Sequence, residues 1–292
     1  MTAANQTQNQ VLMPGNLTEL FSLWNRIPGA VPFAGGTNIM HDTADSGSAP
    51  RVFREQPELP NAILSLEKIE DLHNITRTER YLELGAMVRL SDIIALGKIV
   101  PHAFSRTLQG IANPPVRNMA TIGGNICSGG DSLAALCALD AVYELRNAGN
   151  SRWVSAFRYS SMVKNLQKGE LLTRIRVPLE EWNYTVYRKF NSQDSGGEGG
   201  VLILIVRNQK NMLTGIQVIF IGFPSGETQP VLLRDKESEA FLEGKALPLD
   251  RRDAGHYRKF WEAYLDTMHY PGLLLRDKIL NAIETGIYSL SG

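Results

Sequence analysis

Apolar residues near the start of the chain recur at helical spacing, over residues 17–27. Asn16 followed by Glu19 is typical of a helix N-cap with a capping acid. The apolar run at 30–34 predicts a short buried strand, in which Pro32 requires a position where the sheet loses no donor. The aperiodic stretch 42–60 predicts a long surface loop before another strand at 62–66.

Further along, the pattern changes mainly to strands. An alternating or continuously apolar character predicts strands at 81–84, 142–145, 153–154, 171–177, 184–190, 201–206 and 212–220. Helical spacing predicts helices at 132–141 and over 257–268. This order predicts an α+β protein whose first domain spans 11–180, in two lobes at 11–66 and 67–180. A second domain, 181–292, would hold a three-stranded sheet with helices packed on it.

Two glycine pairs, Gly35-Gly36 and Gly123-Gly124, stand in similar surroundings, one in each predicted lobe. Thr37 and Asn38 follow the first pair, while Thr121 precedes and Asn125 follows the second. Glycine permits positive φ and close approach of the backbone, so successive N–H groups can face an anion. A helix that starts just afterwards adds its free N–H groups and dipole. One turn per lobe could clamp a diphosphate from both sides and leave the rest of a dinucleotide along the lobe interface.

Other classes of protein lack support. The glycine turns match neither the Rossmann spacing G-x-G-x-x-G nor the P-loop G-x-x-x-x-G-K-[ST]. Thirty basic and thirty acidic residues cancel, without long runs of one sign, so nucleic acid and anionic membranes are not expected partners. The longest apolar run, 201–206, is too short to span a bilayer. Scattered histidines predict no metal site.

The two cysteines, Cys127 and Cys137, suit neither a metal clip nor a disulfide framework, and we expect a cytoplasmic protein. Two cysteines also cannot hold an iron–sulfur cluster of the usual four-cysteine kind. Cys127, although beside the second turn, is expected to be a small buried apolar residue rather than a participant in chemistry.

The residues 32–38, PFAGGTN, together with 117–126, RNMATIGGNI, resemble the FAD-binding medium subunit of the molybdenum hydroxylases, the xanthine dehydrogenase and carbon monoxide dehydrogenase family. The resemblance continues through 169–173, 175–178 and 187–189 and covers nearly the whole chain. It implies a two-lobed FAD-binding fold of the vanillyl-alcohol-oxidase (PCMH) type, followed by a C-terminal flavoprotein domain.

The resemblance also implies an oxidoreductase role. Electrons would pass from a molybdopterin subunit through a 2Fe-2S subunit to FAD on this chain, and then to NAD or another acceptor. No residue of this chain would be catalytic, because the flavin carries the chemistry and the protein supplies orientation and electrostatics.

Carried over by position, the resemblance assigns the following residues to FAD. The adenosine-pyrophosphate side would be lined by Phe33, Ala34, Gly35, Gly36, Thr37, Asn38 and Ile39. The second phosphate turn would include Ala120, Thr121, Gly124 and Asn125. Asp131 would bind a ribityl hydroxyl and Ile111 would lie against the isoalloxazine. Leu172 would offer backbone groups to the pyrimidine edge, and Lys189 would lie near a flavin carbonyl.

One departure from the family keeps alternatives open. After Lys189 the family usually has two arginines, whereas this chain has Gln193-Asp194 and then a glycine-rich segment, 195–200. A free-standing FAD-dependent oxidase or reductase of the same fold is one alternative. A flavin-free assembly subunit is the other.

Overall fold

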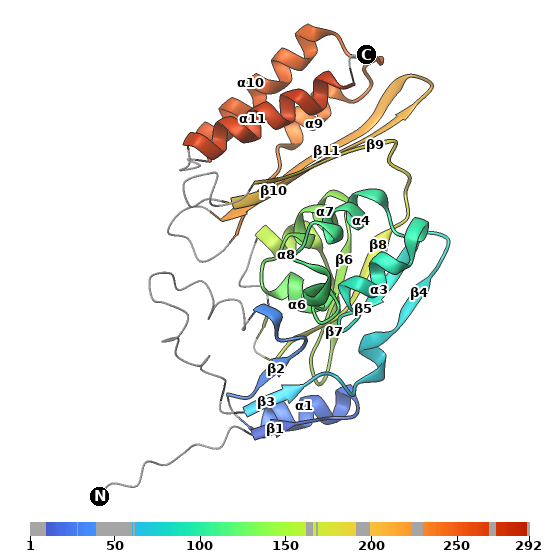
Figure 1. Ribbon diagram of the computed structural model, residues 1–292, viewed down its shortest axis with the longest axis vertical. Helices are drawn as coiled ribbons and strands as arrows, with labels where there is room; N and C mark the ends of the chain where they lie inside the picture. The colour runs from blue at the N-terminus through green and yellow to red at the C-terminus, as the bar shows by residue number, and fades with distance from the viewer. Residues whose placement is uncertain are drawn as a thin grey trace, which may run out of the picture.

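The computed structural model describes residues 10–27, 29–38, 60, 62–161, 166–167, 169–190, 199–223, 230–268 and 273–290. Three sheets follow one another along the longest axis of the molecule, with helices between and outside them (Figure 1). The predicted α+β class is confirmed by this segregation of helices and sheets.

The N-terminal lobe is a three-stranded parallel sheet in the order β1-β3-β2. Its strands are β1 Gln10–Leu12, β2 Val31–Phe33 and β3 Ala62–Ser65. The predicted first helix is α1, Leu17–Arg26, and the predicted cap is confirmed because the Asn16 side chain accepts from the Glu19 amide at 2.9 Å. Pro32 lies in β2, which is an edge strand. A proline is tolerated there because it has no backbone N–H to donate to a neighbouring strand.

The second lobe is a five-stranded antiparallel sheet in the order β4-β5-β8-β6-β7. Its strands are β4 Ile75–Arg77, β5 Tyr81–Gly85, β6 Val142–Arg146, β7 Ser151–Ser155 and β8 Leu171–Pro178. Its short helices are η2 Glu70–His73, α3 Leu90–Ala95, η3 Gly97–Ile99, α4 His102–Gln109, α5 Pro114–Arg117, α6 Ile122–Cys127, α7 Ser132–Ala138 and α8 Ala156–Ser161.

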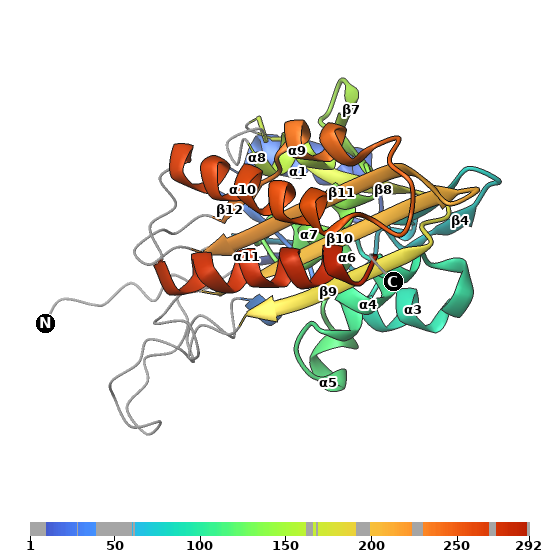
Figure 2. The same ribbon diagram turned by 90° about the horizontal axis from the view of Figure 1, so that it is seen from above.

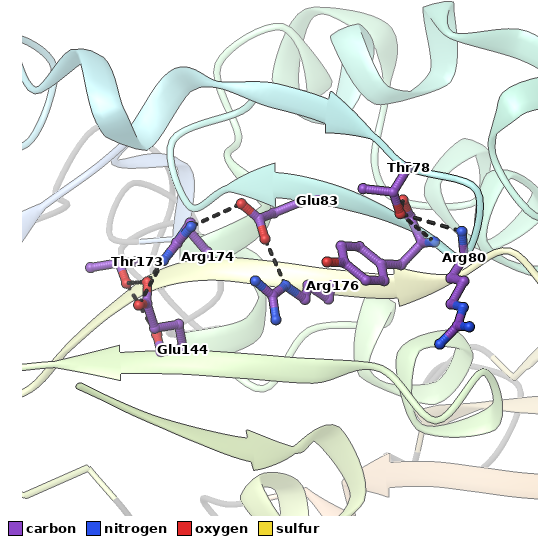
Figure 3. A network of polar contacts seen from close by, with 8 residues as sticks. Thr78, Arg80, Glu83, Glu144, Thr173, Arg174 and Arg176 are labelled. Carbon is purple, nitrogen blue, oxygen red and sulfur yellow. Dashed lines mark hydrogen bonds and ion pairs between the residues drawn. The ribbon is translucent and has the colours of Figure 1, made fainter.

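Ion pairs tie three strands of this sheet together (Figure 3). On β8, Arg174 donates to Glu144 of β6 at 2.7 and 2.8 Å and to Glu83 of β5 at 3.0 Å. Arg176 donates to the other oxygen of Glu83 at 2.6 Å, and Thr173 donates to Glu144 at 2.7 Å. Burial would raise the pKa of the Glu144 carboxyl, but the bonds from Arg174 and Thr173 hold that pKa below its usual range. The network fixes β8, whose first residues belong to the site described below.

The C-terminal sheet has four strands in the order β12-β11-β10-β9, so the expectation of three strands was wrong by one. Its strands are β9 Tyr184–Phe190, β10 Gly199–Gln209, β11 Met212–Phe223 and β12 Val231–Leu233. The additional strand, β12, pairs with β11 through only three residues, which is too short for a pattern to reveal. Helices α9 Lys236–Leu242, α10 Arg251–Thr267 and α11 Leu273–Tyr288 follow or flank it.

The C-terminal sheet is buried on both faces, which explains the continuous apolar run 201–206. Alternate residues of β10 point to opposite sides. Val201, Ile203 and Ile205 pack with the helices of the second lobe, whereas Leu202 and Leu204 pack with α10 and α11. In Figures 1 and 2, α10 and α11 cover one face of this sheet, and α4 and α7 lie between it and the five-stranded sheet. No helix in the described ranges is long and apolar enough to cross a bilayer.

Candidate functional site

A cavity of about 320 Å³ lies where the first lobe meets the second, and both glycine motifs line it. Of the fifteen residues that the sequence assigned to a cofactor, the cavity is lined by Phe33, Ala34, Gly35, Gly36, Thr37, Asn38, Ile111, Ala120, Thr121, Gly124, Asn125 and Leu172. Ile39 lies outside the described residues. The volume falls within the range of small-molecule sites.

The two motifs are in direct contact. A Cβ on Gly35 would lie 2.0 Å from the Met119 carbonyl oxygen, so the backbone of one motif rests on the backbone of the other. A Cβ on Gly124 would come within 3.9 Å of the Ala34 Cβ. Segments 84 residues or more apart in the sequence therefore form one surface, as the diphosphate clamp requires.

The four glycines, for which positive φ was one reason to expect a glycine pair, do not serve one common purpose. Only Gly36 has a left-handed φ, at +68°. Gly123 and Gly124 lie in the first turn of α6, and a Cβ on Gly123 would be 2.7 Å from both the carbonyl oxygen and the Cβ of Ala86. Gly123 therefore serves the packing of α6 against the segment after β5.

The two glycine turns also differ in the hydrogen bonds that their backbone amides make. The amides of Ile122, Gly123 and Gly124 already donate, to Val88 O at 2.9 Å, Ala86 O at 2.8 Å and Thr121 Oγ1 at 3.1 Å. The prediction of free N–H groups at this helix start was therefore wrong. At the first turn, in contrast, the amides of Gly35 and Gly36 have no acceptor among the described residues. Because an unpaired amide can donate to an anion, the first turn offers donors that the amides of Ile122, Gly123 and Gly124 do not.

Most of the rest of the cavity wall is apolar. Ile111 is 9% exposed and Leu172 is 3% exposed. Other apolar side chains that line the cavity are those of Leu66, Met87, Ala112, Val116 and Leu171. Leu171 and Leu172 begin β8, which the ion-pair network of Figure 3 holds in the sheet. A flat aromatic ring system suits such a wall.

Asp131 and Lys189 are not among the residues that line the cavity. They form an ion pair at 2.7 Å, and Lys189 Nζ also donates to the Gly110 carbonyl at 3.1 Å. Asp131 precedes α7, and Lys189 lies on β9. The pair therefore joins the C-terminal sheet to the second lobe close to the cavity wall.

Sequence reasoning missed several residues of the cavity. Cys127 is exposed and lines it, so the expectation of a buried cysteine was wrong. The Tyr159 hydroxyl donates to its Sγ at 3.8 Å. Met87 is the second residue after β5, and the small residues Gly85-Ala86 before it were the available signal of a close approach.

The residues of the cavity suit FAD. Two unpaired amides at a glycine turn can bind a phosphate, and Gly124 leaves open the space that a larger side chain would occupy. The apolar wall can face the isoalloxazine.

Comparison with known proteins decides the family. Residues 6–180 match the family described as "FAD binding domain in molybdopterin dehydrogenase". The chain belongs to this family. It is an FAD-binding subunit of the molybdenum hydroxylase type and part of an oxidoreductase.

Two relatives agree with this membership. The glyceraldehyde dehydrogenase medium chain of Sulfolobus acidocaldarius is 26% identical over 253 residues, covering 79% of this chain and 89% of the relative. The carbon monoxide dehydrogenase medium chain of Afipia carboxidovorans is 29% identical over 175 residues, covering 57% of each chain. Among solved structures, quinoline 2-oxidoreductase of Pseudomonas putida 86 has the same fold, with a TM-score of 0.72 and 19% identity, over 97% of this chain and 95% of the other.

Proposed function

We propose that this chain binds the FAD pyrophosphate at the Gly35-Gly36 turn and carries electrons from a partner's iron–sulfur clusters to NAD or another acceptor. The observation that carries the proposal is the convergence of both glycine motifs on one cavity with unpaired amides at the first. The bound FAD supplies the redox chemistry.

The residues of the chain divide this task. Gly35 and Gly36 offer amides to the phosphates, while Thr37, Asn38 and Asn125 add polar side chains at the same cavity. The apolar wall would orient the isoalloxazine and shield it from water.

Further support comes from what the relatives are called. Two of them are medium chains, a term that implies other chains in the same assembly. We propose a 2Fe-2S subunit and a molybdopterin subunit as the partners of this chain, and a cytoplasmic location, which two free cysteines favour.

FAD titration of the chain and of Gly124→Val tests the site. A Cβ on Gly124 would meet Thr121 Oγ1 at 3.0 Å and Ala34 Cβ at 3.9 Å. We therefore expect the chain to fold with a small side chain at this position, and that side chain would occupy part of the cavity. We expect Gly124→Val to keep its circular dichroism spectrum and to lose FAD, whereas Gly149→Ala, with nothing within 4 Å, should bind normally.

The outcomes separate the alternatives. If the wild-type chain binds no FAD, a flavin-free assembly role replaces the proposal. If the chain alone turns over a small molecule at the expense of oxygen, without metal-containing partners, it is a free-standing oxidase. Undiminished FAD binding by Gly124→Val would show that the pyrophosphate does not lie between the two glycine motifs.

A further inference from the structure

Arg117 opens the second motif, RNMATIGG, yet neither the cavity lining nor the family assignment gives it a role. Its guanidinium reaches back to the loop that follows α4. Arg117 Nη1 donates to three carbonyl oxygens, those of Gln109 at 3.2 Å, Ile111 at 2.7 Å and Ala112 at 2.8 Å. One guanidinium therefore links the end of α4 to the turn that follows it.

This loop needs such a tie. Gln109 ends α4, and the last carbonyls of a helix have no partner within the helix. Ala112 has a φ of +45°, in the left-handed region that side chains other than glycine rarely adopt. Three carbonyl oxygens that converge on one point repel one another unless a cation lies between them. The described residues contain no carboxylate in an ion pair with Arg117, so its positive charge is not offset locally.

The same loop is a wall of the cavity. Ile111 and Ala112 line it, as does Val116 from α5. On its other side the loop meets the C-terminal sheet, because a Cβ on Gly110 would lie 2.0 Å from the Tyr187 hydroxyl oxygen and Lys189 donates to the Gly110 carbonyl. Between Arg117 and β9 the loop has little freedom to move.

We propose that Arg117 is a positioning residue of the flavin site, which holds Ile111 and the left-handed Ala112 in place as a wall against the ring system. The inference rests on the proposed function, since the wall matters only if a flavin lies on it. Arg117 acts through the loop carbonyls and does not itself line the cavity.

The test compares Arg117→Met and Arg117→Lys with Arg106→Met, an exposed arginine of α4 whose loss removes the same charge but none of these three bonds. Three quantities are measured: amide hydrogen exchange of residues 109–113 without FAD, the FAD dissociation constant, and the shape of the bound flavin's visible absorption. We expect Arg117→Met to speed the exchange, to weaken FAD binding by about tenfold or more, and to alter the spectrum. Arg117→Lys should recover part of each, because an ammonium keeps the charge but lacks the planar fork.

Unchanged exchange, affinity and spectrum in Arg117→Met would overturn the inference. If that variant does not fold, Arg117→Lys decides, and wild-type values for all three quantities would overturn it as well. Equal losses in Arg106→Met would show that general charge, and not the tie to the loop, is responsible. Failure of the wild-type chain to bind FAD would instead refute the proposed function, whatever the exchange of the loop shows.

Discussion

Gly35→Ala tests whether backbone contact between the lobes shapes the flavin site. The new Cβ would lie 2.0 Å from the Met119 carbonyl oxygen, 2.9 Å from its carbon and 3.4 Å from the Ala120 Cα. Because real Cβ atoms essentially never come closer than 3.0 Å to such an atom, the two backbones must move apart by about 1 Å. Overpacking of this kind costs about 1–3 kcal/mol.

The strain can appear in two ways, and both are measurable. If the lobes stay together, the free energy of unfolding without FAD falls by about 1–3 kcal/mol. If the lobes separate, FAD must bring them back together against this strain. The affinity for FAD then falls by about 5- to 140-fold, at about 1.4 kcal/mol per factor of ten. Urea unfolding and fluorescence titration with FAD measure the two parts, with Gly149→Ala as the matched control. Wild-type stability together with wild-type affinity would refute the contact.

Three further predictions concern other parts of the chain. FAD should protect Cys127 from a thiol reagent at alkaline pH, while Cys137, which is buried, should remain unlabelled in either state, as mass spectrometry would show; labelling of Cys127 at the same rate with bound FAD would contradict its place in the cavity. Gly255→Ala, inside α10 with nothing within 4 Å, should raise the free energy of unfolding by about 1 kcal/mol, and no gain in urea unfolding would argue against this helix. Hydrogen bonds from Arg152 lower the pKa of the buried Glu170 carboxyl. The ionised carboxylate therefore stabilises the folded protein at neutral pH, and this contribution is lost as pH falls below the usual carboxyl range. Glu170→Gln should therefore lose more stability at pH 7 than at about pH 4, and an equal loss at both would contradict the role of its charge.

The sequence was informative where one physical requirement decides the residue. Strand β9 was predicted with the observed bounds because β-branched and aromatic residues fill most of it, and the Asn16 cap follows from side-chain chemistry alone. The lining of the cavity by both glycine motifs was predicted as well. β1, in contrast, went unrecognised, because three residues with an exposed Val11 show no pattern of burial.

Other features depend on contacts between distant residues, which no local pattern contains. That Gly123 makes room for Ala86, and that Gly35 makes room for Met119, follows only from the folded arrangement. The amides of α6 were expected to be free because helix starts usually are, but neighbouring carbonyls from the segment after β5 occupy them. The partnership of Lys189 with Asp131 is also of this kind, since 58 residues separate them.

The placement of α4 and α7 between two sheets has a consequence for how the chain can be divided. The apolar side chains of β10 and β11 that face these helices belong to the same buried cluster as the strands of the second lobe. A polypeptide cut after Pro178 would leave that helical layer bare to water, so we expect it to aggregate rather than serve as a minimal flavin-binding fragment. Both halves should melt in a single cooperative transition.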